Sequence, residues 1–172
     1  AARTVPMRSK EEAHDYRYFP EPDLPPLQLT PEWIDSVRAA LPELPAARQR
    51  RFVLDYDLPD EDAAWLAHDR DVATFFESTA EASGDAKASR HWIMGPVAHR
   101  MNRAGVDIGG VGVQPPALAE LIRLVESGTV SRSTAKTVFD VMCESGRPAQ
   151  AIIDEEGLSQ IADRGAVLEI VI

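Results

Sequence analysis

The chain has 172 residues, of which 44% are apolar and 27% charged, enough for one globular domain or two small ones. Its formal net charge of -10 argues against a nucleic-acid binder that depends on bulk attraction to phosphate. No apolar run approaches the roughly 18 residues of a membrane-spanning helix, so no membrane association is expected. The single cysteine, Cys143, excludes an internal disulfide and favours a reducing, cytoplasmic setting.

Residues 1–29 are predicted to form an extended strap. Four prolines fall close together at positions 20, 22, 25 and 26. Proline lacks a backbone N–H and pushes the residue before it toward extended geometry. Because the apolar side chains of this segment have no core of their own, we expect the strap to lie against another surface.

Helices follow the strap. Thr30 and Pro31 are typical of an N-cap and a first helical residue. The patterns predict helices at about residues 31–41, 45–56, 60–68 and 70–82. Asp60 and Asp69 are predicted to cap the third and fourth of these. The fourth carries a stripe at helical spacing that we expect to be buried, made of Val72, Phe75, Phe76 and Thr79.

A longer helix is predicted over residues 86–104, with a kink at Gly95 and Pro96. Residues 105–116 hold four glycines and two prolines, which predicts a hinge-like linker and a domain boundary. Further helices are predicted at about residues 116–128, 131–146, 148–157 and 164–172. The expected fold is therefore mainly α, with a strap at 1–29, a helical domain at 30–112 and a tail domain at 113–172.

Basic residues gather in three places. Arg48, Arg50 and Arg51 form the densest cluster, which is either a phosphate contact or, as we favour, a solvated helix face. The long helix carries two groups, each within about one turn. The tail has one pair of basic residues at i, i+4 spacing, Arg132 and Lys136. The basic residues of the long helix and of the tail are the candidate RNA contacts: Lys87, Arg90, Arg100, Arg103, Arg132 and Lys136.

No metal site is predicted. The four histidines, at positions 14, 68, 91 and 99, include no pair three or four residues apart, which is the spacing that two ligands on one helix need. Cys143 adjoins an apolar helical stripe and is interpreted as a core thiol. The glycine-rich segment lacks the G-x-x-x-x-G-K-[ST] pattern and is interpreted as a hinge and not as a phosphate-binding loop.

The run RSKEEAHDYRYFPEPDLPPL, from Arg8 to Leu27, resembles the B subunit of the aspartyl/glutamyl-tRNA amidotransferases. The similarity continues through LPELP (Leu41–Pro45), RQRRF and FFE. GTVSRSTAKTVFDVM and GLSQIAD are similar to the start of that family's tail domain, which is itself similar to YqeY-type proteins. The strap then corresponds to the end of the family's large cradle domain. The missing initiator Met and the apolar last residues lead us to expect a fragment, with a truncated tail.

The resemblance implies a role in converting Glu-tRNA(Gln) or Asp-tRNA(Asn) to the amidated form. It implies two protein partners, the amidase (A) subunit and the small (C) subunit of the same complex. It also implies a cradle that uses ATP and Mg²⁺, and helical and tail domains that hold tRNA. We expect this fragment alone to bind no cofactor and to be inactive. Which of the two tRNA substrates is preferred stays open.

Seven charged strap residues are candidates for lining the cradle's pocket under this resemblance, and salt links that fix the strap are the structural alternative. They are Arg8, Lys10, Glu11, Asp15, Arg17, Glu21 and Asp23. The acidic net charge favours a second functional hypothesis, in which the chain is a helical protein-interaction adaptor that touches no RNA.

Overall fold

The fold is described from a computed structural model, which defines residues 23–24 and 27–158. The chain divides into two compact units, Ala1–Pro42 and Glu43–Ile172. Most of the predicted strap and the helix predicted at 164–172 lie outside the described residues. Within the described residues no helix is both long and apolar enough to cross a membrane.

The described part of the first unit contains one helix, α1 (Pro31–Ala40). The backbone N–H of Trp33 donates to the Thr30 side chain at 3.2 Å, which confirms the predicted N-cap. None of the residues of α1 is buried, and Trp33, Ile34 and Val37 remain exposed. A helix of this length is marginal without tertiary contacts, so α1 presents an apolar face without contributing to a core.

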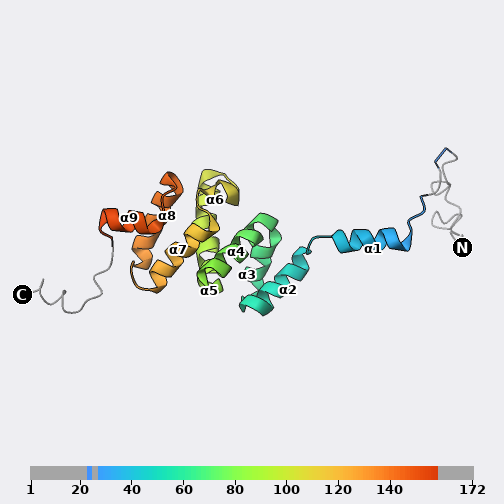
Figure 1. The fold of residues 1–172 in the computed structure, drawn as a ribbon, viewed down its shortest axis with the longest axis horizontal. Helices are drawn as coiled ribbons and strands as arrows, with labels where there is room; N and C mark the ends of the chain where they lie inside the picture. The colour runs from blue at the N-terminus through green and yellow to red at the C-terminus, as the bar shows by residue number, and fades with distance from the viewer. Residues whose placement is uncertain (1–22, 25–26, 159–172) are drawn as a thin grey trace, which may run out of the picture. The chain divides into compact units, whose positions relative to one another are not determined.

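The second unit is built from helices in chain order (Figure 1). They are α2 (Pro45–Tyr56), α3 (Asp60–His68), α4 (Arg70–Ser83), α5 (Ala86–Trp92), the π-helix η2 (Ile93–Val97), α6 (Ala98–Ala104), the 3-10 helix η3 (Ile108–Val111), α7 (Pro115–Glu126), α8 (Arg132–Ser145) and α9 (Ala149–Glu156). The described residues contain no strand, so the predicted mainly α fold is confirmed.

Two local predictions differ from the structure. Pro59, and not Asp60, is the N-cap residue of α3, and Asp60 is the first helical residue. The expected kink at Gly95 and Pro96 is a π-helical turn that joins α5 to α6. Pro96 has no N–H to donate within an α-helix, and a wider π turn accommodates such a residue. The long helix therefore continues through this point.

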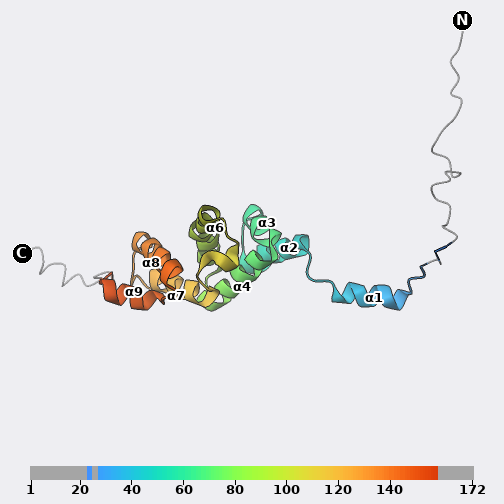
Figure 2. The same cartoon turned by 90° about the horizontal axis from the view of Figure 1, so that it is seen from above.

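The core of the second unit is centred on α4. The predicted stripe of Val72, Phe75, Phe76 and Thr79 is buried, and the Thr79 hydroxyl donates to the Phe75 carbonyl at 2.8 Å. The rings of Phe52 and Phe76 lie 5.1 Å apart. α7 packs against α4 on one side and against α8 on the other, as both views show (Figures 1 and 2).

The glycine-rich segment between α6 and α7 is packed into this core. Ile108, Val111 and Val113 are buried. Gly112 has a φ of +92°, and a Cβ atom there would lie less than 3.0 Å from the carbonyl oxygen of Cys143 in α8. Gly112 therefore lies close against α8, and the segment that we predicted to be a hinge is packed against the core. The domain boundary predicted between residues 112 and 113 remains a prediction.

Candidate nucleic-acid interface

Two adjoining cavities lie between the helix formed by α5, η2 and α6 on one side and α8 on the other. Their volumes are about 340 and 410 Å³, and both are lined by His91, Pro96 and Lys136. We call the two together the basic groove. Its cationic and histidine lining consists of Lys87, Arg90, His91, His99, Arg100, Arg103, Arg132 and Lys136.

Local sequence features set the walls of the groove. Asp85 caps α5 by accepting the N–H of Ala88 at 2.8 Å, and Ser131 caps α8 by accepting the N–H of Thr134 at 3.1 Å. The rings of Trp92 and Phe139 lie 5.8 Å apart and connect the two walls. Both rings are buried, so they form one contact between α5 and α8 inside the protein.

All six basic residues predicted to contact RNA line the basic groove. The smaller cavity brings together Lys87, Arg90, Arg132 and Lys136, and the larger one brings together Arg100, Arg103 and Lys136. Helical spacing groups the residues of each helix, but it carries no information on whether two helices meet. The convergence of α8 on the long helix appears only in the structure.

Neighbouring carboxylates pair with half of these cations. Lys87 lies 2.6 Å from Asp57, Arg90 lies 2.8 Å from Asp62, and Arg100 lies 3.8 Å from Glu144. Among the described residues no ion pair is formed by the other three, which are Arg103, Arg132 and Lys136. The groove therefore keeps cations that are available to an anionic ligand.

Two of the three arginines of the cluster on α2 pair with carboxylates. Arg48 is buried and lies 3.3 Å from Glu43, while Arg51 lies 2.7 Å from Glu43 and 2.5 Å from Glu77. The hydrogen bonds from Arg51 hold the pKa of the Glu43 carboxyl below its usual value. Carboxylates therefore already engage Arg48 and Arg51, which favours the structural alternative for these two, whereas Arg50 is exposed and bonds only to the Ala46 carbonyl among the described residues.

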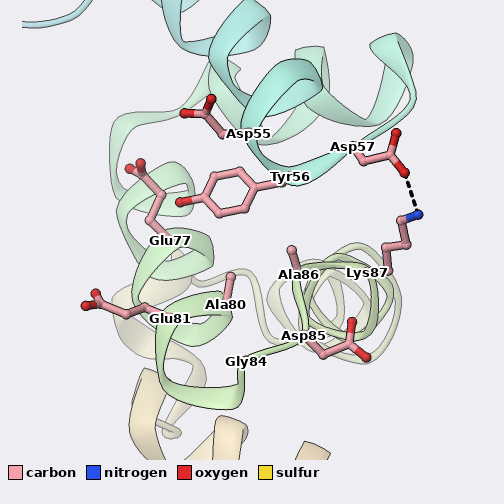
Figure 3. A pocket seen from close by; sticks show the side chains of 10 residues that line it. All are labelled: Asp55, Tyr56, Asp57, Glu77, Ala80, Glu81, Gly84, Asp85, Ala86 and Lys87. Carbon is pink, nitrogen blue, oxygen red and sulfur yellow. Dashed lines mark hydrogen bonds and ion pairs between the residues drawn. The ribbon is translucent and has the colours of Figure 1, made fainter.

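A third cavity, of about 730 Å³, lies between the end of α2, α4 and the start of α5 (Figure 3). We call it the acidic hollow. Its carboxylates are Asp55, Asp57, Glu77, Glu81 and Asp85, and Lys87 is its one basic lining residue. Burial, followed by the charge of Glu77, raises the pKa of the Tyr56 hydroxyl, whose ring points toward Glu77 in Figure 3.

The described residues contain no preformed cluster of three protein ligands for the Mg²⁺ that the family resemblance implies. No group of three histidine, cysteine or carboxylate side chains within them is arranged to hold a metal ion. The carboxylates of the acidic hollow are spread along its walls, and the Lys87 ammonium holds the pKa of the Asp57 carboxyl below its usual value. No step that involves ATP or Mg²⁺ is therefore assigned to these residues.

The candidate pocket residues of the strap are almost all outside the described part of the chain. Asp23 lies in a turn and is exposed. The others are Arg8, Lys10, Glu11, Asp15, Arg17 and Glu21. Cys143 is half-buried, and its burial raises the thiol pKa to about 11, so it is no nucleophile at neutral pH.

The fold and the groove of the described residues define a class of protein, an acidic α-helical protein in which six lysine and arginine side chains line one groove. Residues 74–172 match the sequence model of the GatB domain, and residues 1–35 match that of the GatB/GatE catalytic domain. The first match covers more than half of the chain, which therefore belongs to the GatB domain family.

Curated relatives agree with this result. The chain is 52% identical over 168 residues to the aspartyl/glutamyl-tRNA(Asn/Gln) amidotransferase B subunit of Bordetella pertussis, 46% over 164 residues to that of Syntrophotalea carbinolica, and 43% over 170 residues to that of Brevibacillus brevis. These alignments cover 95%, 95% and 99% of the chain. They cover 35%, 34% and 36% of the relatives, so the chain spans about a third of their length. The resemblance stated from the sequence is confirmed.

Proposed function

We propose that this chain is the tRNA-binding part of the B subunit of an aspartyl/glutamyl-tRNA amidotransferase and that it holds tRNA in the basic groove. The observation that supports this most directly is the gathering of six lysine and arginine side chains in one groove of a chain with a net charge of -10. Phosphate contacts supply most of the affinity of proteins for RNA, and they require clustered cations of this kind.

The groove combines paired and free cations, which suits a binding surface. Arg103, Arg132 and Lys136 can contact phosphates without breaking an ion pair seen in the described residues. Arginine offers a bidentate fork to a phosphate, and lysine offers a point charge. The carboxylates of the acidic hollow repel phosphate, so they direct the RNA toward the groove.

The activity of the whole enzyme belongs to the same proposal. In it, the parent protein converts Glu-tRNA(Gln) or Asp-tRNA(Asn) to the amidated form with ATP and Mg²⁺, in the cytoplasm, together with the amidase (A) subunit and the small (C) subunit. The names of the relatives support the amidotransferase assignment. The cation-lined groove favours RNA binding over the acidic adaptor hypothesis.

A titration of the chain with tRNA at two salt concentrations tests the proposal. The variant to compare combines Arg103→Glu, Arg132→Glu and Lys136→Glu, which reverses the three free cations. It should abolish measurable binding. Milder alanine variants at the same positions should lower the slope of log K against log salt by about one for each residue.

The control carries the same change in net charge away from the groove. Arg38→Glu, Arg50→Glu and Arg70→Glu reverse three arginines, none of which lines the basic groove. We expect this control to bind tRNA within about threefold of the parent chain, because screening limits the reach of charges outside the contact. Equal losses in the two triple variants, or no tRNA binding by the parent chain at low salt, would contradict the proposal.

A further inference from the structure

The larger cavity of the basic groove differs from a simple phosphate-binding surface. It has a volume of about 410 Å³ and lies beside the π-helix η2. Volumes of this size are typical of sites for small molecules and cofactors. π-Helical turns also occur frequently at functional sites. We propose that this cavity binds one unpaired nucleotide of an RNA loop, an inference that rests on the proposed function.

Part of the lining of the cavity is apolar. Pro96 and Phe139 line it, and Gly95 leaves one side free. A Cβ atom built on Gly95 would meet no atom within 4 Å. The glycine therefore leaves unfilled space on the face of the helix that contains the cations, where a flat ring can enter.

The walls carry planar groups. His91 and His99 come from α5 and α6, and the guanidinium groups of Arg100 and Arg103 come from α6. Imidazole rings and guanidinium planes are the surfaces on which unpaired RNA bases stack. A wall of lysines alone would attract phosphate without offering such a surface.

The charged residues of the cavity suit the two parts of a nucleotide, its base and its phosphate. Arg103 and Lys136 can hold the phosphate, since no ion pair within the described residues engages either of them. Asp140 also lines the cavity, and its carboxylate opposes a second phosphate but can accept a hydrogen bond from the amino group of a base. This mixture fits a whole nucleotide better than a bare phosphate.

Base pairing decides which RNA can use the site. In a duplex the bases are stacked inside the helix and cannot enter a cavity between two protein helices. An unpaired loop base can turn outward without breaking a pair. The chain should therefore prefer a stem with a loop over a continuous duplex that carries the same number of phosphates.

The test uses the whole chain and two RNAs of equal charge, a hairpin with 2-aminopurine in its loop and a fully paired duplex. The parent chain should bind the hairpin about tenfold more tightly and change the fluorescence of its loop base. Gly95→Leu fills the cavity and should remove this preference while leaving duplex binding within about twofold of the parent. Ala104→Leu adds the same side chain on α6 outside the cavity and should leave both affinities unchanged.

His99→Ala provides a second variant, because His99 is exposed and its loss does not threaten folding. It should weaken hairpin binding about threefold and spare duplex binding. Circular dichroism checks that each variant is folded. If Gly95→Leu does not fold, the result for His99→Ala decides the test. Equal binding of hairpin and duplex, or a hairpin preference that survives the variants, overturns this inference and leaves the proposed function standing. Absence of binding to either RNA overturns the proposed function as well.

Discussion

The basic groove and the acidic hollow both lie in the second unit, and Lys87 lines both of them. The groove is lined by six lysine and arginine side chains and three carboxylates, Asp85, Glu126 and Asp140, whereas the hollow is lined by five carboxylates and the single Lys87. A net charge of -10 describes neither surface. The comparison teaches that a chain-wide charge says little about binding when the fold distributes the two signs unevenly over its surfaces.

The two surfaces also differ in how they are built. The hollow is formed by helices that follow one another closely in the chain, α2, α4 and the start of α5. The groove needs α8 to lie against the long helix, although α7 and the glycine-rich segment separate the two in the sequence. A perturbation of α8 should therefore affect the groove and leave the hollow intact.

The largest expected effect comes from Gly112→Ala. The new Cβ would collide with the Cys143 carbonyl oxygen, and the φ of +92° is unfavourable for alanine. We expect a loss of about 3 kcal/mol in the free energy of unfolding and much weaker RNA binding at the displaced wall. Chemical denaturation and the tRNA titration measure the two effects.

Gly109→Ala is the matched control in the same segment. Its Cβ would meet only the Asp107 side chain at 3.4 Å, and its φ lies outside the left-handed region. The change in stability should stay within about 0.5 kcal/mol. Similar losses for the two variants would show that the segment does not hold α8 in the described way.

A smaller effect is expected from Glu43→Gln, which removes a carboxylate partner of Arg51, the arginine that also pairs with Glu77 of the hollow. The pKa of Glu43 is lowered by Arg51, so the stabilisation is present above the unfolded value of 4.5 and is lost as pH falls through the folded value. The variant should lose about 1 kcal/mol at neutral pH, because Arg48 and Arg51 lose a partner. RNA binding should not change.

Denaturation curves at several pH values check this expectation. The difference between the parent chain and Glu43→Gln should vanish in acid, where Glu43 of the parent is protonated. Glu81→Gln removes an exposed carboxylate of the hollow and should show no such pH-dependent difference. A constant difference across the pH range would mean that the Glu43 charge is not the cause.

The smallest effect should come from Asp57→Asn, at the point where the two surfaces meet. It releases Lys87 from its ion pair at 2.6 Å, and asparagine tolerates the left-handed φ of 51° that this position adopts. The affinity for tRNA should rise about twofold at low salt. Asp55→Asn changes the net charge equally without releasing Lys87, so an equal rise in both variants would remove the specific role of the pair.

Local structure was predictable where short-range chemistry decides it. Thr30, Asp69 and Ser131 cap their helices as their residue types suggest. The buried stripe of α4 followed from its spacing. Asp60 failed as a cap because the preceding proline takes that position, a difference of one residue at a helix end.

The candidate site was predictable only in its parts. The i, i+4 pair of Arg132 and Lys136 and the cations of the long helix were visible in the sequence. Their meeting depends on the Trp92–Phe139 contact and on the close approach of Gly112 to α8, which join distant segments. Arg90 and Asp62 are also far apart in the sequence, and no spacing rule identifies their pairing.

The contact of Trp92 with Phe139 has an optical consequence. The three tryptophans of the chain are Trp33, Trp65 and Trp92, and of these only Trp92 is buried. Because Trp92 also lines the smaller cavity, we expect its emission to respond to occupancy of the groove, whereas the two exposed indoles should be open to aqueous quenchers. The molecule thus contains a built-in fluorescent reporter of its own binding surface.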